Sequence, residues 1–181
     1  TVTVENVYLE NTEWTSSTSG TGFNAASTTN PYAGSKDIEG TNVANAAYVQ
    51  LERSTSMTLD TATTLSLFIR SKATWSGTRK LRLQFYASGV AKGAAITLAS
   101  GYWGFDSSIT TGYQFVVIPI TQFQITAGTS INQLRITDAG GAIGFYIDNI
   151  IITSITGTPT PQFLTIAQGD ARYFLLTNEA T

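Results

Sequence analysis

The stretch FYIDNIIIT, residues 145–153, carries the strongest strand signal in the chain. Its aromatic and β-branched side chains favour extended backbone over helix. Ile147 and Ile150 are both apolar although they are three residues apart, and strict alternation would place them on opposite faces. We therefore predict a buried strand with a β-bulge near Asp148 and Asn149, which brings both isoleucines inward and redirects the aspartate.

Other segments alternate apolar and polar residues with the period of two that marks a strand with one buried face. Turn signals such as Ser76-Gly77 and Ser88-Gly89 separate them, and no long amphipathic helical pattern lies between them. We count about eight strands, at the spacing of an all-β jelly-roll β-sandwich. The strand segments are 2–9, 47–52, 65–70, 81–86, 113–120, 133–137 and 145–153, with 93–103 ambiguous.

Residues 12–40 are rich in Ser, Thr, Asn and Gly. A structureless loop of that length is uncommon inside a domain. We expect this segment to hide short strands or to carry function.

The composition of the 181-residue chain excludes several classes of protein. Without cysteine there is no disulfide, thiolate nucleophile or Cys-ligated metal, and without histidine the commonest general base and zinc ligand are missing. A net charge of −2 argues against nucleic-acid binding, and no apolar run approaches the ~20 residues of a membrane span. We therefore expect neither a nucleic-acid partner nor membrane insertion.

The chain is expected to have two parts, a domain over residues 1–155 and a linker and connector over residues 156–181. Gly157-Thr158-Pro159-Thr160-Pro161 has the composition of a semi-rigid linker, and residues 167–176 suit one short helix. Residues 162–181 are too few to bury a core of their own. They must pack on a partner chain, pack back on the domain, or belong to something longer.

Three stretches, in this order, resemble the jelly-roll carbohydrate-binding modules attached to bacterial polysaccharide-degrading enzymes. They are residues 34–38, the strand YQFVVIPITQF at 113–123, and the closing strand FYIDNI at 145–150. Tyr113 stands where that family usually has tryptophan. The resemblance covers residues 1–154 and implies a sandwich that binds carbohydrate without catalysis.

Residues 163–175, FLTIAQGDARYFL, resemble a segment of bacteriophage tail-fibre and baseplate proteins, with Gly169 where alanine is more usual. This resemblance implies a virion location in the phage tail, a homotrimer formed through the C-terminal segment, and adhesion to a host-surface polysaccharide. Two alternatives stay open. One is a substrate-targeting module of a secreted, extracellular polysaccharide-degrading enzyme, and the other is a structural virion domain with no sugar ligand.

Several strands place glutamine, arginine and aromatic residues on the face opposite the apolar one. Planar amide and guanidinium groups suit the hydroxyls of a sugar, and aromatic rings suit its C–H faces. This outward face indicates a shallow glycan-binding groove, and the alternative is a face covered by a loop or another subunit. The residues are Tyr48, Gln50, Phe68, Arg70, Arg82, Gln84, Tyr86, Gln133 and Arg135.

Aromatic residues in predicted loops form a second candidate for sugar binding. Trp103 is assigned to the binding site because the glycines of Gly101-Tyr102-Trp103-Gly104-Phe105 let the backbone expose its rings. The alternative is packing at the ends of the sandwich. The loop aromatics are Trp14, Tyr32, Trp75, Tyr102 and Trp103.

The resemblance to carbohydrate-binding modules also implies a structural calcium ion. Asp148 matches the aspartate of the closing strand, and Glu10 is a better match for its acidic partner than Glu5 or Glu13. Calcium takes six to eight hard oxygens, and backbone carbonyls around residues 36–37 would supply some of them. The alternative is that Asp148 accepts hydrogen bonds from backbone N–H groups of a turn.

Catalysis is not expected. The twelve carboxylates show no pattern that suggests a pair across a cleft, and serine and threonine lack a histidine base. Arg79, Lys80 and Arg82 form the one basic cluster, which we interpret as a solvated edge rather than a nucleic-acid site.

Overall fold

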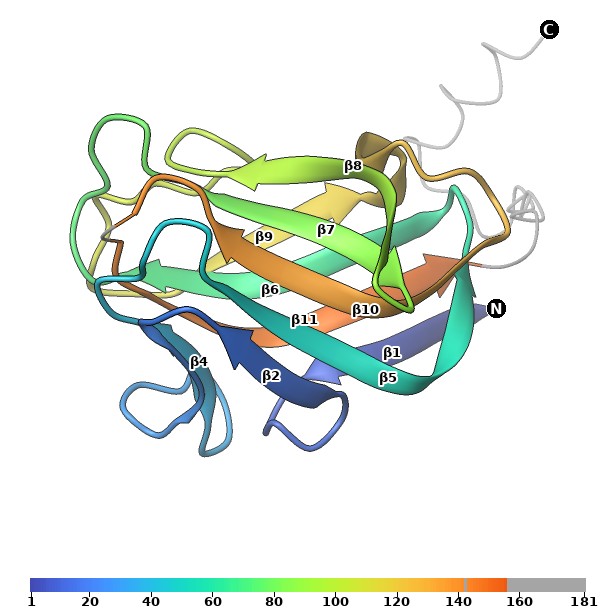
Figure 1. Cartoon of the computed structure of the whole chain (residues 1–181), viewed down its shortest axis with the longest axis horizontal. Coiled ribbons are helices and arrows are strands. Elements are labelled where there is room, and N and C mark those ends of the chain that lie inside the picture. Colours follow the sequence, from blue (N-terminus) through green and yellow to red (C-terminus); the bar gives the residue numbers. More distant parts are fainter. Residues whose placement is uncertain (142, 156–181) are drawn as a thin grey trace, which may run out of the picture.

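The computed structural model describes residues 1–141 and 143–155, which form two stacked antiparallel β-sheets (Figure 1). None of the helical segments in these residues has the length and apolarity of a membrane span. The elements are β1 (Val2–Tyr8), β2 (Thr15–Ser19), β3 (Phe23–Ser27), β4 (Asp37–Gly40), β5 (Tyr48–Leu59), β6 (Thr63–Ser71), β7 (Leu81–Ala87), β8 (Val90–Leu98), β9 (Gln114–Pro119), the 3-10 helix η1 (Ile120–Phe123), β10 (Thr129–Asp138) and β11 (Phe145–Ile155).

The two sheets divide the strands between them. The five-stranded sheet has the order β2-β5-β10-β7-β8. The six-stranded sheet has the order β3-β4-β11-β6-β9, and β1 pairs with β11 as well. β4 pairs with residues 145–147 of β11 and β1 with residues 150–155, so these two strands share one side of β11. The all-β jelly-roll sandwich predicted from the sequence is confirmed.

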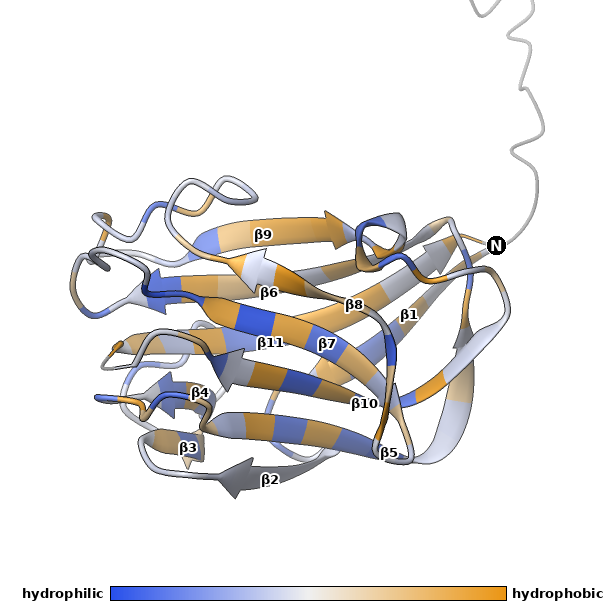
Figure 2. Cartoon of the chain, turned by 45° about the horizontal axis from the view of Figure 1, so that its top comes forward, coloured by the Kyte–Doolittle hydropathy of each residue, from blue (hydrophilic) through white to orange (hydrophobic). Residues whose placement is uncertain are grey.

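The core lies between the sheets because each strand turns its apolar row inward. Leu65, Leu67 and Ile69 of β6 are fully buried, as are Leu83 and Phe85 of β7 in the other sheet. Burying one such side chain contributes roughly 1.5–3 kcal/mol. Apolar and polar residues alternate along β7 and β10, which leaves the outer face of the five-stranded sheet polar (Figure 2).

The predicted strands are confirmed in position, but fewer strands were predicted than form. Residues 1–141 and 143–155 form eleven strands where about eight were expected, because residues 12–40 contain three short strands, β2, β3 and β4. The ambiguous segment 93–103 contributes to β8, and Pro119 ends β9, where its missing N–H costs least.

The predicted bulge in β11 is present. The register between β11 and β6 shifts between Asp148 and Ile151, and Asn149 has a positive φ of 47°. Ile147 and Ile150 are consequently both buried, and Asp148 is buried beside them. The bulge therefore points a carboxylate towards the loop of residues 28–36.

The predictions for the end of the chain cannot be compared with this structure. The linker at 157–161, the helix at 167–176 and the tail-fibre-like segment at 163–175 lie outside the described residues. They remain predictions.

Candidate functional site

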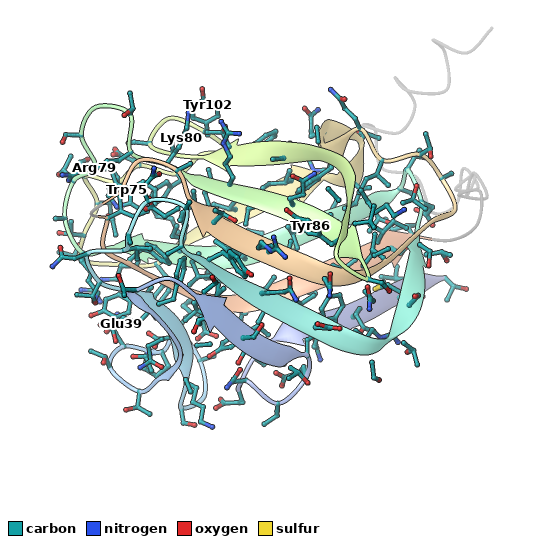
Figure 3. The ribbon with its side chains drawn as sticks, in the orientation of Figure 1. Glu39, Trp75, Arg79, Lys80, Tyr86 and Tyr102 are labelled. Carbon is teal, nitrogen blue, oxygen red and sulfur yellow. The ribbon has the colours of Figure 1, made fainter. Side chains whose placement is uncertain are left out.

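Six polar and aromatic side chains occupy the outer face of the five-stranded sheet. In the ladder of β10, Arg135 lies opposite Gln50 of β5 and Gln84 of β7. Thr137, one step along the same face, lies opposite Tyr48 and Arg82. Figure 3 shows Tyr86 on this face. We call this set the platform, and its members are Tyr48, Gln50, Arg82, Gln84, Tyr86 and Arg135.

The centre of the platform is the guanidinium group of Arg135. Its carbon lies 4.1 Å from the ring centroid of Tyr48 and 4.2 Å from that of Tyr86. Its Nη2 and Nε donate hydrogen bonds to Gln50 Oε1, at 2.7 and 3.2 Å. Cation–π contacts of this kind contribute about 0.5–1 kcal/mol at exposed sites. The arginine therefore holds two rings and one amide in place before any ligand arrives.

Of the two remaining platform residues, Gln84 is held by a hydrogen bond and Arg82 is not. Gln84 Nε2 donates to the carbonyl of Gly93 at 3.0 Å, and the Arg82 side chain is exposed. Gln133, which was predicted for the same face, is only 5% exposed, and its Oε1 accepts a hydrogen bond from the N–H of Gly89. Gln133 thus anchors the β7–β8 turn, so that its amide oxygen is not free for a ligand.

The prediction of one continuous face was wrong for Phe68 and Arg70. Both belong to β6 and lie on the outer face of the six-stranded sheet, on the opposite side of the molecule. The ring of Phe68 is stacked on that of Tyr32 at 3.8 Å, so a loop covers it. Arg70 Nε donates to the carbonyl of Thr110 at 2.7 Å. Alternation separates inward from outward residues, but it does not say which sheet a strand joins.

The loop aromatics divide into buried and exposed groups. Trp14 and Trp75 belong to the core, with Nε1 donating to Glu5 and to the carbonyl of Gly144 respectively. These two tryptophans are therefore packing residues, which was the alternative to sugar binding. Trp103 is half-buried against the core, and its Nε1 donates to the carbonyl of Thr97, so it lies beside the end of β8 and outside the platform.

Tyr32 and Tyr102 are the exposed loop aromatics, at 46% and 51%. Tyr32 is already stacked on Phe68. Tyr102 therefore offers the freer ring of the two.

Asp148 and Glu10, the predicted calcium ligands, both reach the loop of residues 28–36. Asp148 Oδ2 accepts hydrogen bonds from the N–H groups of Tyr32 and Ala33, and its Oδ1 from that of Asn149. Glu10 accepts from the N–H and the hydroxyl of Ser35. Backbone amides thus bind these carboxylates, as in the alternative considered for Asp148.

Asp37 is a third carboxylate in this region, and its side chain was missed at the sequence level. Its Oδ1 is buried without a hydrogen-bond partner, while Tyr113 lies 3.4 Å from Oδ2. Burial raises the pKa of Asp37 and of Asp148, and the charges of Glu39 and Asp148 add to the effect on Asp37. Burial, followed by the nearby carboxylates, also raises the pKa of the Tyr8 hydroxyl.

Two observations bear on whether this region could hold a metal ion, and they point in opposite directions. The orphaned oxygen of Asp37 would suit a hard cation. Within residues 1–141 and 143–155, however, no group of three or more acidic, histidine or cysteine side chains is arranged to hold one.

Two hollows open on the surface of the sandwich. One, of about 500 Å³, lies between β1, β2 and β5 and includes Glu5, Glu13, Glu52 and Arg53 in its lining. Burial opposes ionisation of Glu13, but hydrogen bonds from the N–H groups of Leu9, Glu10 and Thr12 lower its pKa overall.

The second hollow, of about 250 Å³, lies where β7 begins and β8 ends. We call it the basic hollow, and Figure 3 shows Arg79, Lys80 and Tyr102 gathered there. The sequence indicated the basic residues and Tyr102 as separate features. Only the fold shows that Arg79, Lys80 and Tyr102 line the same hollow. Its lining includes Trp75, Arg79, Lys80, Thr97, Ser100 and Tyr102.

No family model matches the sequence, and no curated protein matches it. Solved structures share its fold. A family 29 carbohydrate-binding module matches with a TM-score of 0.52 at 11% identity, covering 84% of this chain and 89% of that one. A family 30 module matches with 0.53 at 14% identity, covering 84% and 99%.

A longer protein is also similar. SGBP-B, from a complex xyloglucan utilization locus in Bacteroides uniformis, matches with a TM-score of 0.51 at 14% identity, covering 83% of this chain and 50% of that one. At these identities the likeness establishes the fold, which is the jelly-roll sandwich of carbohydrate-binding modules. The sequence resemblance to such modules is therefore confirmed at the level of fold.

Proposed function

We propose that this protein is a non-catalytic carbohydrate-binding module whose binding site is the platform. The observation that carries the proposal is the arrangement of Tyr48, Arg135 and Tyr86 across three neighbouring strands. The rings offer apolar faces to sugar C–H groups, and the guanidinium and amide groups offer planar donors to hydroxyls. Because Arg135 already orders its neighbours, little side-chain freedom is lost on binding.

The distribution of carboxylates supports a binding rather than a hydrolytic role. Retaining and inverting glycosidases generally use two carboxylates that flank the scissile bond. The six platform residues include none, and Glu52 lies beside them as an acceptor for Gln50 Nε2. In the hollow near β1, Glu13 has a lowered pKa, which is the wrong direction for a general acid.

A panel of polysaccharides tests the proposal. The full chain is run through native gels that contain neutral and acidic plant, algal and bacterial polysaccharides, including bacterial envelope extract, and the Arg135→Ala variant is run beside it. Retardation of the wild type, and loss of that retardation in the variant, is the expected result. If the wild type is retarded by no polysaccharide, the structural virion domain considered above becomes the better explanation.

The proposal extends to a bacteriophage tail, on the resemblance of residues 163–175 alone. There the chain would form a homotrimer through residues 162–181, in which weak single sites bind a surface together. Sedimentation equilibrium should give a trimer for the full chain and a monomer for a chain ending at residue 161. A monomeric full chain would instead favour the linker of a secreted enzyme.

A structural calcium ion also belongs to the proposal, supported by the family resemblance and by the orphaned oxygen of Asp37. Glu10 and Asp148 would hold it together with backbone carbonyls around residues 36–37, and the ion would tie the first strand and its loop to the last strand. Calcium at about 100 times its Kd should raise the melting midpoint by roughly 5–10 °C relative to chelator. Magnesium at the same concentration serves as the control, and an unchanged midpoint would count against the ion.

The pH dependence supplies an independent readout of the same region. Without an ion, the raised pKa of Asp37 means that its contribution to the free energy of unfolding is complete at low pH and is lost as pH rises through that pKa. Asp37→Asn should therefore gain stability relative to the wild type in chelator as pH rises above the ordinary pKa of an aspartate. Calcium should reverse the gain. Urea unfolding at several pH values measures both effects.

A further inference from the structure

The basic hollow continues the platform at one end of the five-stranded sheet. Thr97 lines the hollow and is the ladder partner of Arg82, a platform residue. Lys80, which also lines the hollow, immediately precedes β7 and is two residues from Arg82. A saccharide lying across the platform would thus reach the hollow without crossing another element.

The hollow is basic because its cations lack acidic partners in the lining. Its lining includes Arg79 and Lys80 and no aspartate or glutamate. Among residues 1–141 and 143–155, the ion pairs are Arg53 with Glu5 and Lys72 with Glu39, both elsewhere. Arg79 and Lys80 are also half-buried, so their charges are less screened than those of fully exposed side chains.

Two carboxylates lie near the hollow, and each is held by other groups. Asp138 is buried, and its Oδ1 accepts hydrogen bonds from the N–H groups of Gly140 and Gly141, although the charge of Arg79 does act on it. Asp106 accepts from the N–H and hydroxyl of Ser108, and more distantly from Ser100. Together the platform and hollow present Arg79, Lys80, Arg82 and Arg135, against Glu52 at the other end.

From this juxtaposition we propose that the basic hollow binds an anionic group, a carboxylate or sulfate, on the saccharide that lies on the platform. The inference rests on the proposed function and names its ligand class as an acidic polysaccharide. A volume of about 250 Å³ is below the usual range of about 300–1,000 Å³ for ligand pockets, so it suits one charged substituent. Tyr102, 51% exposed, supplies an aromatic surface beside the two cations.

Matched pairs of polymers test the ligand class. The pairs are methyl-esterified and de-esterified homogalacturonan, hydroxyethyl- and carboxymethylcellulose, and desulfated and sulfated galactan. The full chain should bind the acidic member of at least one pair at least about tenfold more tightly, the weight of one charge-assisted hydrogen bond. The preference should shrink at about 0.5 M salt, which screens charges over a few ångströms.

Two lysine variants locate the effect. Lys80→Gln should remove most of the preference for the acidic polymer and leave binding of neutral polymers within about twofold of wild type. Lys36→Gln is the control, because it makes the same change of charge just before β4, a strand of the six-stranded sheet. This variant should keep the preference for the acidic polymer.

The possible results separate this inference from the proposed function. Binding to neutral polymers alone, or an equal effect of the two lysine variants, would overturn the inference and leave carbohydrate binding in place. Binding to no polysaccharide at all would overturn both.

Discussion

Replacing Arg135 by alanine should weaken polysaccharide binding at least tenfold, and about thirtyfold or more if this residue behaves as an interface hot spot. The substitution removes the group that contacts both Tyr48 and Tyr86, and it frees Gln50 from its two hydrogen bonds. Both direct contact with the sugar and the order of the platform are therefore lost. Titration calorimetry with a polysaccharide from the panel measures the change.

Arg70 offers a matched control on the opposite sheet. It also projects outward from a strand, and its guanidinium carbon lies 5.9 Å from the ring centroid of Tyr146. Arg70→Ala should leave binding within about twofold of the wild type, as expected of surface positions outside an interface core. A loss with Arg70→Ala but not with Arg135→Ala would move the site to the six-stranded sheet. Melting curves of both variants confirm that each is folded.

Replacing Asp148 by alanine should lower the free energy of unfolding by about 3–5 kcal/mol. The carboxylate is fully buried and accepts hydrogen bonds from Tyr32, Ala33 and Asn149 at 2.8, 3.1 and 2.7 Å. Alanine would leave those N–H groups without an acceptor in the sandwich. A loss of this size is a large share of the stability of one domain. Urea unfolding monitored by tryptophan fluorescence measures it.

A graded series keeps this prediction testable if the alanine variant folds poorly. Asp148→Asn retains one acceptor oxygen and should lose less stability than Asp148→Ala. Asp106→Ala removes a carboxylate that also accepts hydrogen bonds, but from an exposed loop, and its midpoint should stay near that of the wild type. Equal effects of the Asp148→Ala and Asp106→Ala substitutions would contradict the anchoring role of Asp148.

The strands with strict alternation are predictable because burial of one face leaves a direct trace in the sequence. Residues 81–86 show this clearly. In residues 145–153 the alternation breaks at Asp148, and the bulge follows from that break. β2 and β3 leave no such trace. β2 is composed of serine and threonine, and it becomes a strand by pairing with β5.

The candidate site is predictable only in part. Tyr48, Tyr86 and Arg135 have the expected chemistry, but their proximity depends on the pairing of β10 with both β5 and β7. The same pattern wrongly added Phe68 and Arg70, because sheet membership is decided by long-range pairing. The sequence did not predict a role for the Asp37 side chain, because its burial depends on contacts such as that with Tyr113, 76 positions away.

The pairing of β1 with β11 has a mechanical consequence. Val2 is the ladder partner of Ile155, and the N-terminus lies at the same end of the molecule as the end of β11 (Figure 1). A force that separates these two ends would load the ladder one hydrogen-bonded pair at a time. The domain would then unzip from that corner, and the next strand loaded from the N-terminal side would be β2, at the edge of the sheet that carries the platform.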